Sequence, residues 1–180
     1  MDPVTVGCVK YLNTVPLIEG LDKLPQITLV PAAPSKLVGM LTGRSETRID
    51  IGLVSLVDVA RAPEPLALIP AGMIGCDGPT LTVRVFSGVP IERITELHAD
   101  TDSHTSVVLA RILLARRFGT TPTLIDFDAR ERVARGPSTS SSEAHAQGWP
   151  EALLMIGDKV VTDSPPAVRY PYQIDLGEVW

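Results

Sequence analysis

The chain has 180 residues, a formal net charge of −5, and 44% apolar but only 4% aromatic residues. This length suits one large domain or two small lobes, and the apolar fraction is sufficient for a core. The acidic balance and the few aromatic rings exclude a nucleic-acid surface, which needs basic patches and stacking platforms.

The first half of the chain alternates apolar runs with helical segments. The strands that we predict there are Val4–Val9, Gln26–Val30, Ile49–Val54 and Leu66–Met73. The predicted helices run from an Asn13 or Thr14 cap to about Leu21, over Ser35–Thr42 and over Ser55–Arg61. Nearly continuous apolar strands that alternate with helices are typical of a parallel sheet with helices on its faces.

The second half begins with an alternating strand over Leu81–Ser87, which we interpret as the crossing from one lobe to another. The further strands that we predict are Ile94–Ala99, Thr123–Phe127 and Glu151–Ile156, and the clearest helix is Thr105–Phe118. We therefore expect lobe one over residues 1–84 and lobe two over residues 85–180. Within lobe two, the low-complexity run Gly136–Ser142 predicts a mobile surface loop.

Three stretches place small hydrogen-bonding residues where a predicted strand gives way to a turn or a helix. They are Val9–Leu17, Ile74–Val83 and Asp102–Val107. In open α/β proteins, ligands collect at the carboxyl ends of strands and at the N-termini of helices. Three such ends in one chain predict a cleft for a small anion.

The first stretch contains Tyr11-Leu12-Asn13-Thr14, followed by Pro16-Leu17, and resembles the opening motif of chorismate dehydratases from the futalosine route to menaquinone. The other segments that resemble this family are Asp50–Ser55, Gly78-Pro79, Thr105-Ser106, Leu154–Asp158 and Asp175–Trp180. The matches occur in order over nearly the whole chain, so the resemblance is specific although each match alone is weak.

The resemblance implies an α/β fold of the two-lobed, periplasmic-binding-protein-like type (type 2), with the ligand between the lobes. Relatives continue past the position of Trp180 with a strand that returns to lobe one, so we expect lobe one to be incomplete at the C-terminus. The chain departs from the family pattern at Lys10, where Ser is common, and at His104, where Arg is common.

The implied activity is that of a lyase, a hydro-lyase that dehydrates chorismate to 3-(1-carboxyvinyloxy)benzoate in menaquinone biosynthesis, without a cofactor. The alternative is a non-catalytic protein on the same fold that binds a small carboxylate. A third class, the related enzymes that cleave a later naphthoate precursor, fits less well because of the Tyr11–Thr14 motif.

Asn13 is the candidate catalytic residue, because its amide can donate and accept hydrogen bonds at once and could hold the leaving hydroxyl or a carboxylate. The residues that we expect to bind substrate are Lys10, Tyr11, Thr14, Ser55, Thr82, Ser103, Thr105, Ser106 and Gly157. Most have an ordinary structural explanation as well: the hydroxyl groups cap helices or fill a strand, and Lys10 lies on a solvated surface.

No protein base stands out. Asp77 has the sequence surroundings of a turn, Asp158 suits a loop or hinge, and His104 is a cationic candidate near the predicted anion site. The more economical hypothesis is substrate assistance, in which the enolpyruvyl carboxylate of chorismate accepts the proton.

Cys8 and Cys76 are too few for a disulfide framework, and the three histidines lack the spacing of metal ligands. We therefore expect no metal. No segment is long and apolar enough for a membrane span, and the first residues lack the features of a signal peptide. The expected setting is the cytoplasm, with a small anion as partner, no membrane or nucleic acid, and the oligomeric state left open.

Overall fold

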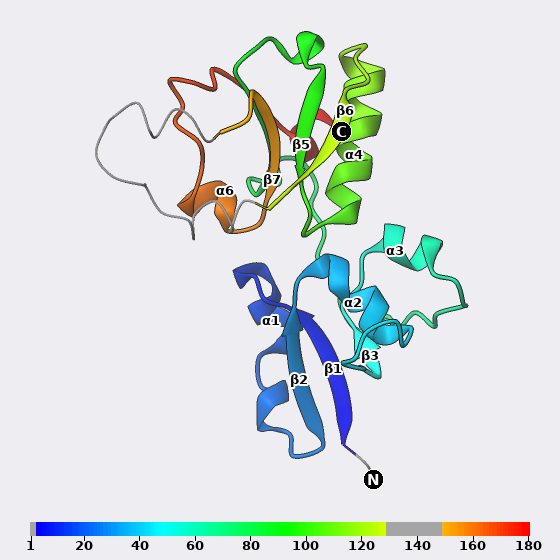
Figure 1. The fold of residues 1–180 in the computed structure, drawn as a ribbon. Coiled ribbons are helices and arrows are strands. Elements are labelled where there is room, and N and C mark those ends of the chain that lie inside the picture. The colour runs from blue at the N-terminus through cyan, green and yellow to red at the C-terminus, as the bar shows by residue number, and fades with distance from the viewer. Residues whose placement is uncertain (1–2, 129–148) are drawn as a thin grey trace. The chain divides into compact units, whose positions relative to one another are not determined.

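The computed structural model describes residues 3–128 and 149–180, and the chain folds into two compact units (Figure 1). Unit 1 comprises Met1–Gly75 and Asp102–Thr105, and unit 2 comprises Cys76–Thr101 and Ser106–Trp180. The first division thus falls after Gly75, earlier than the lobe boundary expected after residue 84, and a short later segment returns to unit 1. The assignment of lobes stays a prediction.

Unit 1 is built on a sheet of three parallel strands in the order β2-β1-β3. The strands are β1 (Val4–Val9), β2 (Ile27–Ala32) and β3 (Ile51–Gly52). The helices are the 3-10 turns Leu12–Thr14 and Leu21–Lys23, α1 (Val15–Ile18), α2 (Pro34–Leu41) and α3 (Leu56–Arg61).

The core of unit 1 lies under α2, where Leu37, Met40 and Ile49 are buried together. Gly7 on the central strand makes this close packing feasible, because a Cβ there would come within 2.8 Å of the Leu37 side chain. The sequence of β1 therefore combines apolar residues with one glycine at the point where α2 and Ile49 approach the backbone.

Unit 2 contains a mixed sheet of five strands in the order β6-β5-β7-β4-β8, in which β5 runs parallel to β6 and β7, and β4 runs antiparallel to β7 and β8. The strands are β4 (Val83–Ser87), β5 (Glu96–Asp100), β6 (Thr123–Phe127), β7 (Ala152–Ile156) and β8 (Tyr172–Asp175). The helices are the 3-10 turn Ile91–Arg93, α4 (His104–Arg117), which begins in unit 1, α6 (Lys159–Thr162) and α7 (Leu176–Val179).

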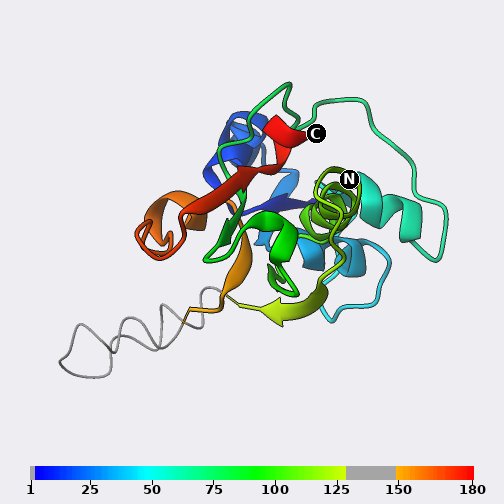
Figure 2. The same cartoon turned by 90° about the horizontal axis from the view of Figure 1, so that it is seen from above.

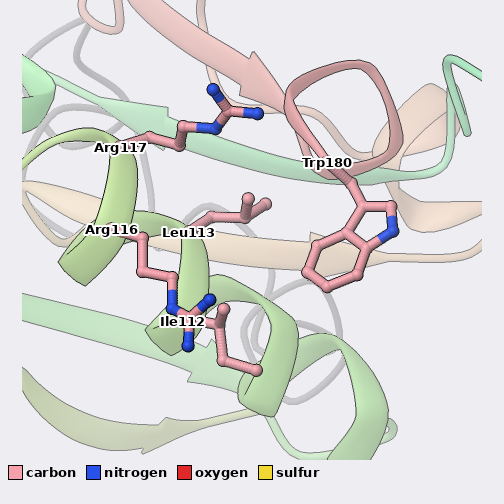
Figure 3. A pocket seen from close by; sticks show the side chains of 5 residues that line it. All are labelled: Ile112, Leu113, Arg116, Arg117 and Trp180. Carbon is pink, nitrogen blue, oxygen red and sulfur yellow. The ribbon is translucent and has the colours of Figure 1, made fainter.

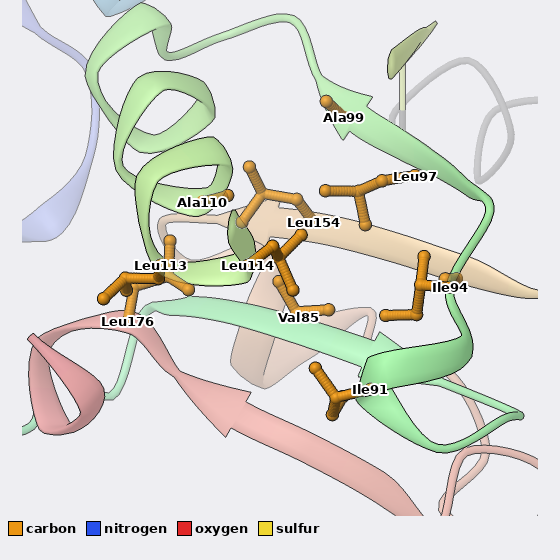
Figure 4. Close-up of a cluster of buried hydrophobic side chains, with 11 residues drawn as sticks. Val85, Ile91, Ile94, Leu97, Ala99, Ala110, Leu113, Leu114, Leu154 and Leu176 are labelled. Carbon is orange, nitrogen blue, oxygen red and sulfur yellow. The ribbon is translucent and has the colours of Figure 1, made fainter. Parts of the chain in front are cut away.

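Both faces of this sheet are covered, so its central strands carry apolar residues on both sides. Val85 and Leu154 pack with Leu113 and Leu114 of α4 in one cluster (Figure 4). The neighbouring side chains of the same two strands, including Phe86, belong to a second cluster with residues of α6. Alternation of side chains along a strand explains why adjacent residues enter different cores.

Several predicted elements are confirmed, with small shifts at their ends. β1 and β6 have the predicted bounds, β7 begins one residue later than predicted, and α4 begins and ends one residue earlier. The expected class, an α/β protein with parallel strand pairs, is also confirmed.

The predicted strand Leu66–Met73 is wrong. Residues 62–82 contain no helix or strand and run as a long coil between α3 and β4 (Figures 1 and 2). Pro65 and Pro70 remove backbone donors from this run, and Leu68 is 84% exposed. Apolar composition alone therefore misled the prediction, because the run pairs with no neighbouring strand.

Two further boundaries are corrected. The predicted crossing strand begins at Val83 and not at Leu81, because Leu81 takes a left-handed conformation with φ of 62°. The strand lies within unit 2. The first predicted helix is broken into a 3-10 turn and the short α1, and neither uses Asn13 or Thr14 as a side-chain cap. The predicted loop Gly136–Ser142 lies outside the described residues.

Candidate functional site

The polar edge of unit 1 is the edge at which its three parallel strands end. β1 is followed by Lys10–Thr14, β3 is followed by residues 53–55, and β2 leads into α2. The segment Asp102–Thr105 joins this edge, since the backbone N–H of Ser35 donates to the carbonyl oxygen of Asp102 at 3.0 Å. Two of the three predicted stretches therefore meet within unit 1.

A side-chain hydrogen bond links these two stretches directly. The Tyr11 hydroxyl donates to Oδ2 of Asp102 at 2.6 Å, and Tyr11 is 9% exposed. Tyr11 was predicted to bind substrate, and in the structure its hydroxyl holds the segment that precedes α4. This bond brings the turn that carries Asn13 and Thr14 to the residues at the start of α4.

A second linkage connects the starts of α3 and α4. Ser55 caps α3, accepting the backbone N–H of Asp58 at 3.1 Å and donating its hydroxyl to Oδ2 of the same residue at 2.7 Å. The other carboxylate oxygen, Oδ1, lies 2.6 Å from Nδ1 of His104. Asp58 is 5% exposed. Its buried carboxylate is therefore bonded on one side to the Ser55 hydroxyl and on the other to the His104 ring. The capping explanation of Ser55 is thus confirmed.

Three groups at this edge lack hydrogen-bond partners among the residues that the structure describes. The Asn13 side chain is exposed and its amide makes no hydrogen bond. Thr14 is fully buried and its hydroxyl is unpartnered, as is the buried hydroxyl of Thr105. Buried polar groups are normally paired, so these two hydroxyls are exceptions, and a role of Thr14 and Thr105 in binding a ligand stays a prediction.

Three other predicted residues are already engaged. Lys10 is exposed, Ser103 is half-buried and Ser106 is buried, and each interacts with other groups of the chain. Ser106 belongs to unit 2, whereas Ser103 and Thr105 belong to unit 1.

The polar edge of unit 2 is where β5, β7 and β8 end and β4 begins. Thr82, directly before β4, accepts the backbone N–H of Gly157 at its carbonyl oxygen with a distance of 2.8 Å. Gly157 has φ of 68°, a conformation that glycine adopts without strain. Two predicted substrate-binding residues are therefore adjacent, and the bond between them is made by the backbone.

Sequence reasoning missed a buried ion pair at the same edge. Nζ of Lys159 lies 2.5 Å from Oδ2 of Asp100, and the two side chains are 7% and 1% exposed. The backbone N–H of Ile156 donates to the same carboxylate oxygen at 3.3 Å. The only sequence signal was a charge at the end of each apolar run, which does not show that the two charges pair.

Asp175, at the end of β8, was also missed. Its carboxylate is 3% exposed and accepts hydrogen bonds from Thr80 and Leu81 as well as from the first turn of α7. Burial raises the pKa of this carboxyl, but the hydrogen bonds from Thr80, Leu81 and Glu178 outweigh it and leave the pKa below its usual value. The group is an ionised, fully bonded carboxylate at neutral pH.

A pocket of about 390 Å³ lies elsewhere in unit 2, between the last turns of α4 and Trp180 (Figure 3). Its lining contains none of the predicted site residues, and Arg116 and Arg117 stand where they complement the dipole of α4. Over residues 3–128 and 149–180, no three His, Cys, Asp or Glu side chains gather as a metal site requires. No helix in these ranges is long and apolar enough to cross a membrane.

Together these features define an α/β protein whose polar groups gather where parallel strands end. A family model described as menaquinone biosynthesis matches residues 4–180. The chain therefore belongs to the menaquinone-biosynthesis family, and the resemblance carried by the Tyr11–Thr14 motif is confirmed.

Proposed function

We propose that this protein is a lyase that dehydrates chorismate to 3-(1-carboxyvinyloxy)benzoate in the futalosine route, in the cytoplasm. The observation that carries the proposal is the buried, unpartnered hydroxyl of Thr14, next to the free amide of Asn13 in the motif that resembles chorismate dehydratases. Family membership supports the pathway. We further propose that the two units are the lobes of a periplasmic-binding-protein-like fold.

The groups at the edge of unit 1 suit an uncharged, orienting role. Chorismate carries two carboxylates, a ring hydroxyl and an enolpyruvyl ether. Its dehydration needs the hydroxyl and the C3 hydrogen held in a fixed arrangement, and orientation alone lowers a barrier by several kcal/mol. The Asn13 amide and the hydroxyl groups of Thr14 and Thr105 supply donors without placing a negative charge beside a dianion.

In the proposed reaction the C3 hydrogen leaves as a proton, and its bonding electrons form the new ring double bond. The C4–oxygen bond breaks, and the leaving hydroxide becomes water on protonation. The Asn13 amide N–H donates to this leaving oxygen. Elimination of water involves no net oxidation or reduction, so the step needs no redox partner, and aromatisation of the ring supplies much of the driving force.

The bonded carboxylates of unit 1 support substrate assistance in place of a protein base. Asp102 accepts the Tyr11 hydroxyl, and Asp58 is held by Ser55 and His104. Both carboxylates are thus already engaged with donors of the chain. The enolpyruvyl carboxylate of the substrate is therefore our candidate for the proton acceptor.

The direct test is incubation of the protein with chorismate, followed by detection of the aromatic enolpyruvyl product. We expect turnover without added nucleotide and in the presence of a chelator. Binding of chorismate without product would favour the non-catalytic carboxylate-binding protein. The absence of both binding and turnover would reject the proposal.

The Thr14→Val variant tests the observation that carries the proposal. Val has nearly the shape of Thr and removes a buried hydroxyl that has no partner, so the free energy of unfolding should not fall. If the hydroxyl binds chorismate, kcat/KM should fall by roughly tenfold to a hundredfold, the value of a hydrogen bond to a charged group. Unchanged kinetics would remove Thr14 from the site.

The His104→Arg variant separates substrate assistance from a histidine base. A guanidinium can still pair with Asp58, so the link between α3 and α4 is preserved. Substrate assistance predicts that kcat stays within about threefold of the parent, whereas loss of a general base lowers the rate by about 100-fold or more. A large fall in a folded variant would make His104 the proton acceptor.

A further inference from the structure

Asp175 joins two segments of unit 2 that are far apart in the sequence. Its Oδ1 accepts the backbone N–H of Thr80 at 2.8 Å and the Thr80 hydroxyl at 2.9 Å, and its Oδ2 accepts the backbone N–H of Leu81 at 2.6 Å. The same Oδ1 caps α7 by accepting the N–H groups of Gly177 at 2.9 Å and Glu178 at 3.3 Å. One buried carboxylate thus serves five donors.

Leu81 lies in the left-handed region with φ of 62°, the one described residue other than glycine with a positive φ. A leucine side chain disfavours this conformation, and Leu81 is 64% exposed, so burial of its own side chain does not enforce it. The bond from its N–H to Asp175 is the contact that holds the backbone there. Strained residues of this kind are maintained by their surroundings and are common near functional sites.

The conformation of Leu81 decides where the next residue lies. Thr82 follows it directly, and its carbonyl oxygen accepts the N–H of Gly157 at 2.8 Å. Thr82 and Gly157 are both among the predicted substrate-binding residues. A change in the backbone conformation of Leu81 therefore moves Thr82, and through the hydrogen bond from Gly157 it also affects Gly157.

A second, independent contact, between Gly177 and residues 78–80, restricts the position of the same turn. A Cβ on Gly177 would meet the carbonyl oxygen of Gly78 and would lie 2.7 Å from Cγ2 of Thr80. The start of α7 therefore packs against residues 78–80 so closely that only glycine fits. Both the carboxylate and this packing act on the turn before β4.

We propose that Asp175 is a positioning residue: it holds Leu81 in its left-handed conformation and so places Thr82 and Gly157 for the reaction. The consequence for turnover rests on the proposed function. The consequence for the conformation of residues 80–82 does not, and the two are tested separately.

The kinetic test compares Asp175→Asn alone with the same variant carrying either Leu81→Gly or Leu81→Ala. Asn retains one acceptor oxygen and loses the charge, so the turn should relax and kcat/KM for chorismate should fall roughly tenfold to a hundredfold, as expected for misplaced contacts. Leu81→Gly should restore most of this loss, because glycine adopts a positive φ freely. Leu81→Ala removes the same side chain without relieving the strain and should restore nothing.

A stabilising role alone would lower the unfolding midpoint and leave the kcat/KM of the folded protein unchanged. That result, or equal rescue by the glycine and alanine variants, overturns the proposal. If Asp175→Asn does not fold, Gly177→Ala replaces it, since it displaces Thr80 and leaves the carboxylate intact. A folded Gly177→Ala variant with the kcat/KM of the parent overturns the proposal as well.

Amide hydrogen exchange provides the readout that does not depend on the reaction. In Asp175→Asn the amides of Leu81 and Gly157 should exchange faster, and Leu81→Gly should restore protection at Gly157. Unchanged exchange at both amides overturns the proposal even if chorismate is turned over. If the parent protein does not turn over chorismate, the proposed function fails, and the exchange pattern alone decides whether Asp175 holds the turn.

Discussion

The polar edges of the two sheets differ in their buried side chains: unit 1 has unpartnered hydroxyls, whereas the buried carboxylates of unit 2 are bonded to several donors. At the edge of unit 1, Asn13, Thr14 and Thr105 have groups without partners. At the edge of unit 2, Asp100 and Asp175 are buried and bonded to several donors. Groups left unpaired reduce stability and are available to a ligand, whereas saturated groups fix the backbone. The comparison separates residues that we expect to touch substrate from residues that position others.

The largest expected effect is a loss of stability when the buried ion pair between Lys159 and Asp100, at the polar edge of unit 2, is broken. Lys159→Met leaves the buried Asp100 carboxylate without its cation, and the free energy of unfolding should fall by about 3–5 kcal/mol. Urea titration measures this change. The control is Lys36→Met on the exposed face of α2, which should change stability by less than about 0.5 kcal/mol. A double variant, Asp100→Asn with Lys159→Met, should be more stable than Lys159→Met alone.

Variants at the polar edge of unit 1 should change activity and leave stability unchanged. Asn13→Asp keeps the size of an exposed side chain but puts a negative charge beside a dianion, so kcat/KM for chorismate should fall by about 100-fold or more. Gln26→Glu makes the same chemical change just before β2, at the opposite end of the strands, and should leave turnover unchanged. Equal effects of the two variants would show that overall charge, not the position of Asn13, is responsible.

A smaller effect is expected at the start of α4. Thr105→Val removes an unpartnered buried hydroxyl, so calorimetric affinity for chorismate or a benzoate analogue should fall by about tenfold or more while stability is kept. Ser106→Ala removes a group that is already engaged and should cost about 1 kcal/mol of stability in a denaturant melt. If Thr105→Val lowers stability and keeps affinity, its hydroxyl belongs to the structure and the comparison fails there.

The smallest expected effect is a change in how stability depends on pH when the Asp175 carboxylate is removed. The pKa of Asp175 is lower in the folded chain than in the unfolded chain, because burial, which raises it, is outweighed by the hydrogen bonds from Thr80 and Leu81. Its contribution is therefore complete above the unfolded value of about 3.9 and is lost as the pH falls through the folded value. Asp175→Asn lacks this titration, so its stability should decline less steeply below about pH 4 than that of the parent. Parallel acid-unfolding curves would contradict this assignment.

The elements that the sequence predicted well are those whose local pattern agrees with their burial. β1, β6 and α4 combine apolar runs with clear ends, and the structure places them as expected. The run Leu66–Met73 is also apolar but remains largely exposed, and among the described residues it pairs with no strand. The left-handed Leu81 could not be predicted, since leucine rarely adopts that conformation and a distant carboxylate enforces it.

A local motif in the sequence was sufficient to propose candidate site residues, whereas contacts between distant residues could not be predicted. The Tyr11–Thr14 motif pointed to Asn13 and Thr14, and the structure shows that the buried Thr14 hydroxyl has no partner among the described residues; their role in binding stays a prediction. The pairs Asp58–His104 and Asp100–Lys159 join residues from separate elements. A single sequence contains no information on which of its many charges meet, so these pairs had to come from the fold.

The strand pairings also imply an order of events during synthesis. The three strands described in the sheet of unit 1 have all been made once Ile51 and Gly52 have emerged from the ribosome. In unit 2, β4 pairs with β7 and with β8, which ends at Asp175. The nascent chain must therefore carry β4 without either of these two strands while residues 88–151 are made. Exposed strands of this kind are prone to aggregate, so we expect this half of the chain to depend more strongly on chaperones during expression.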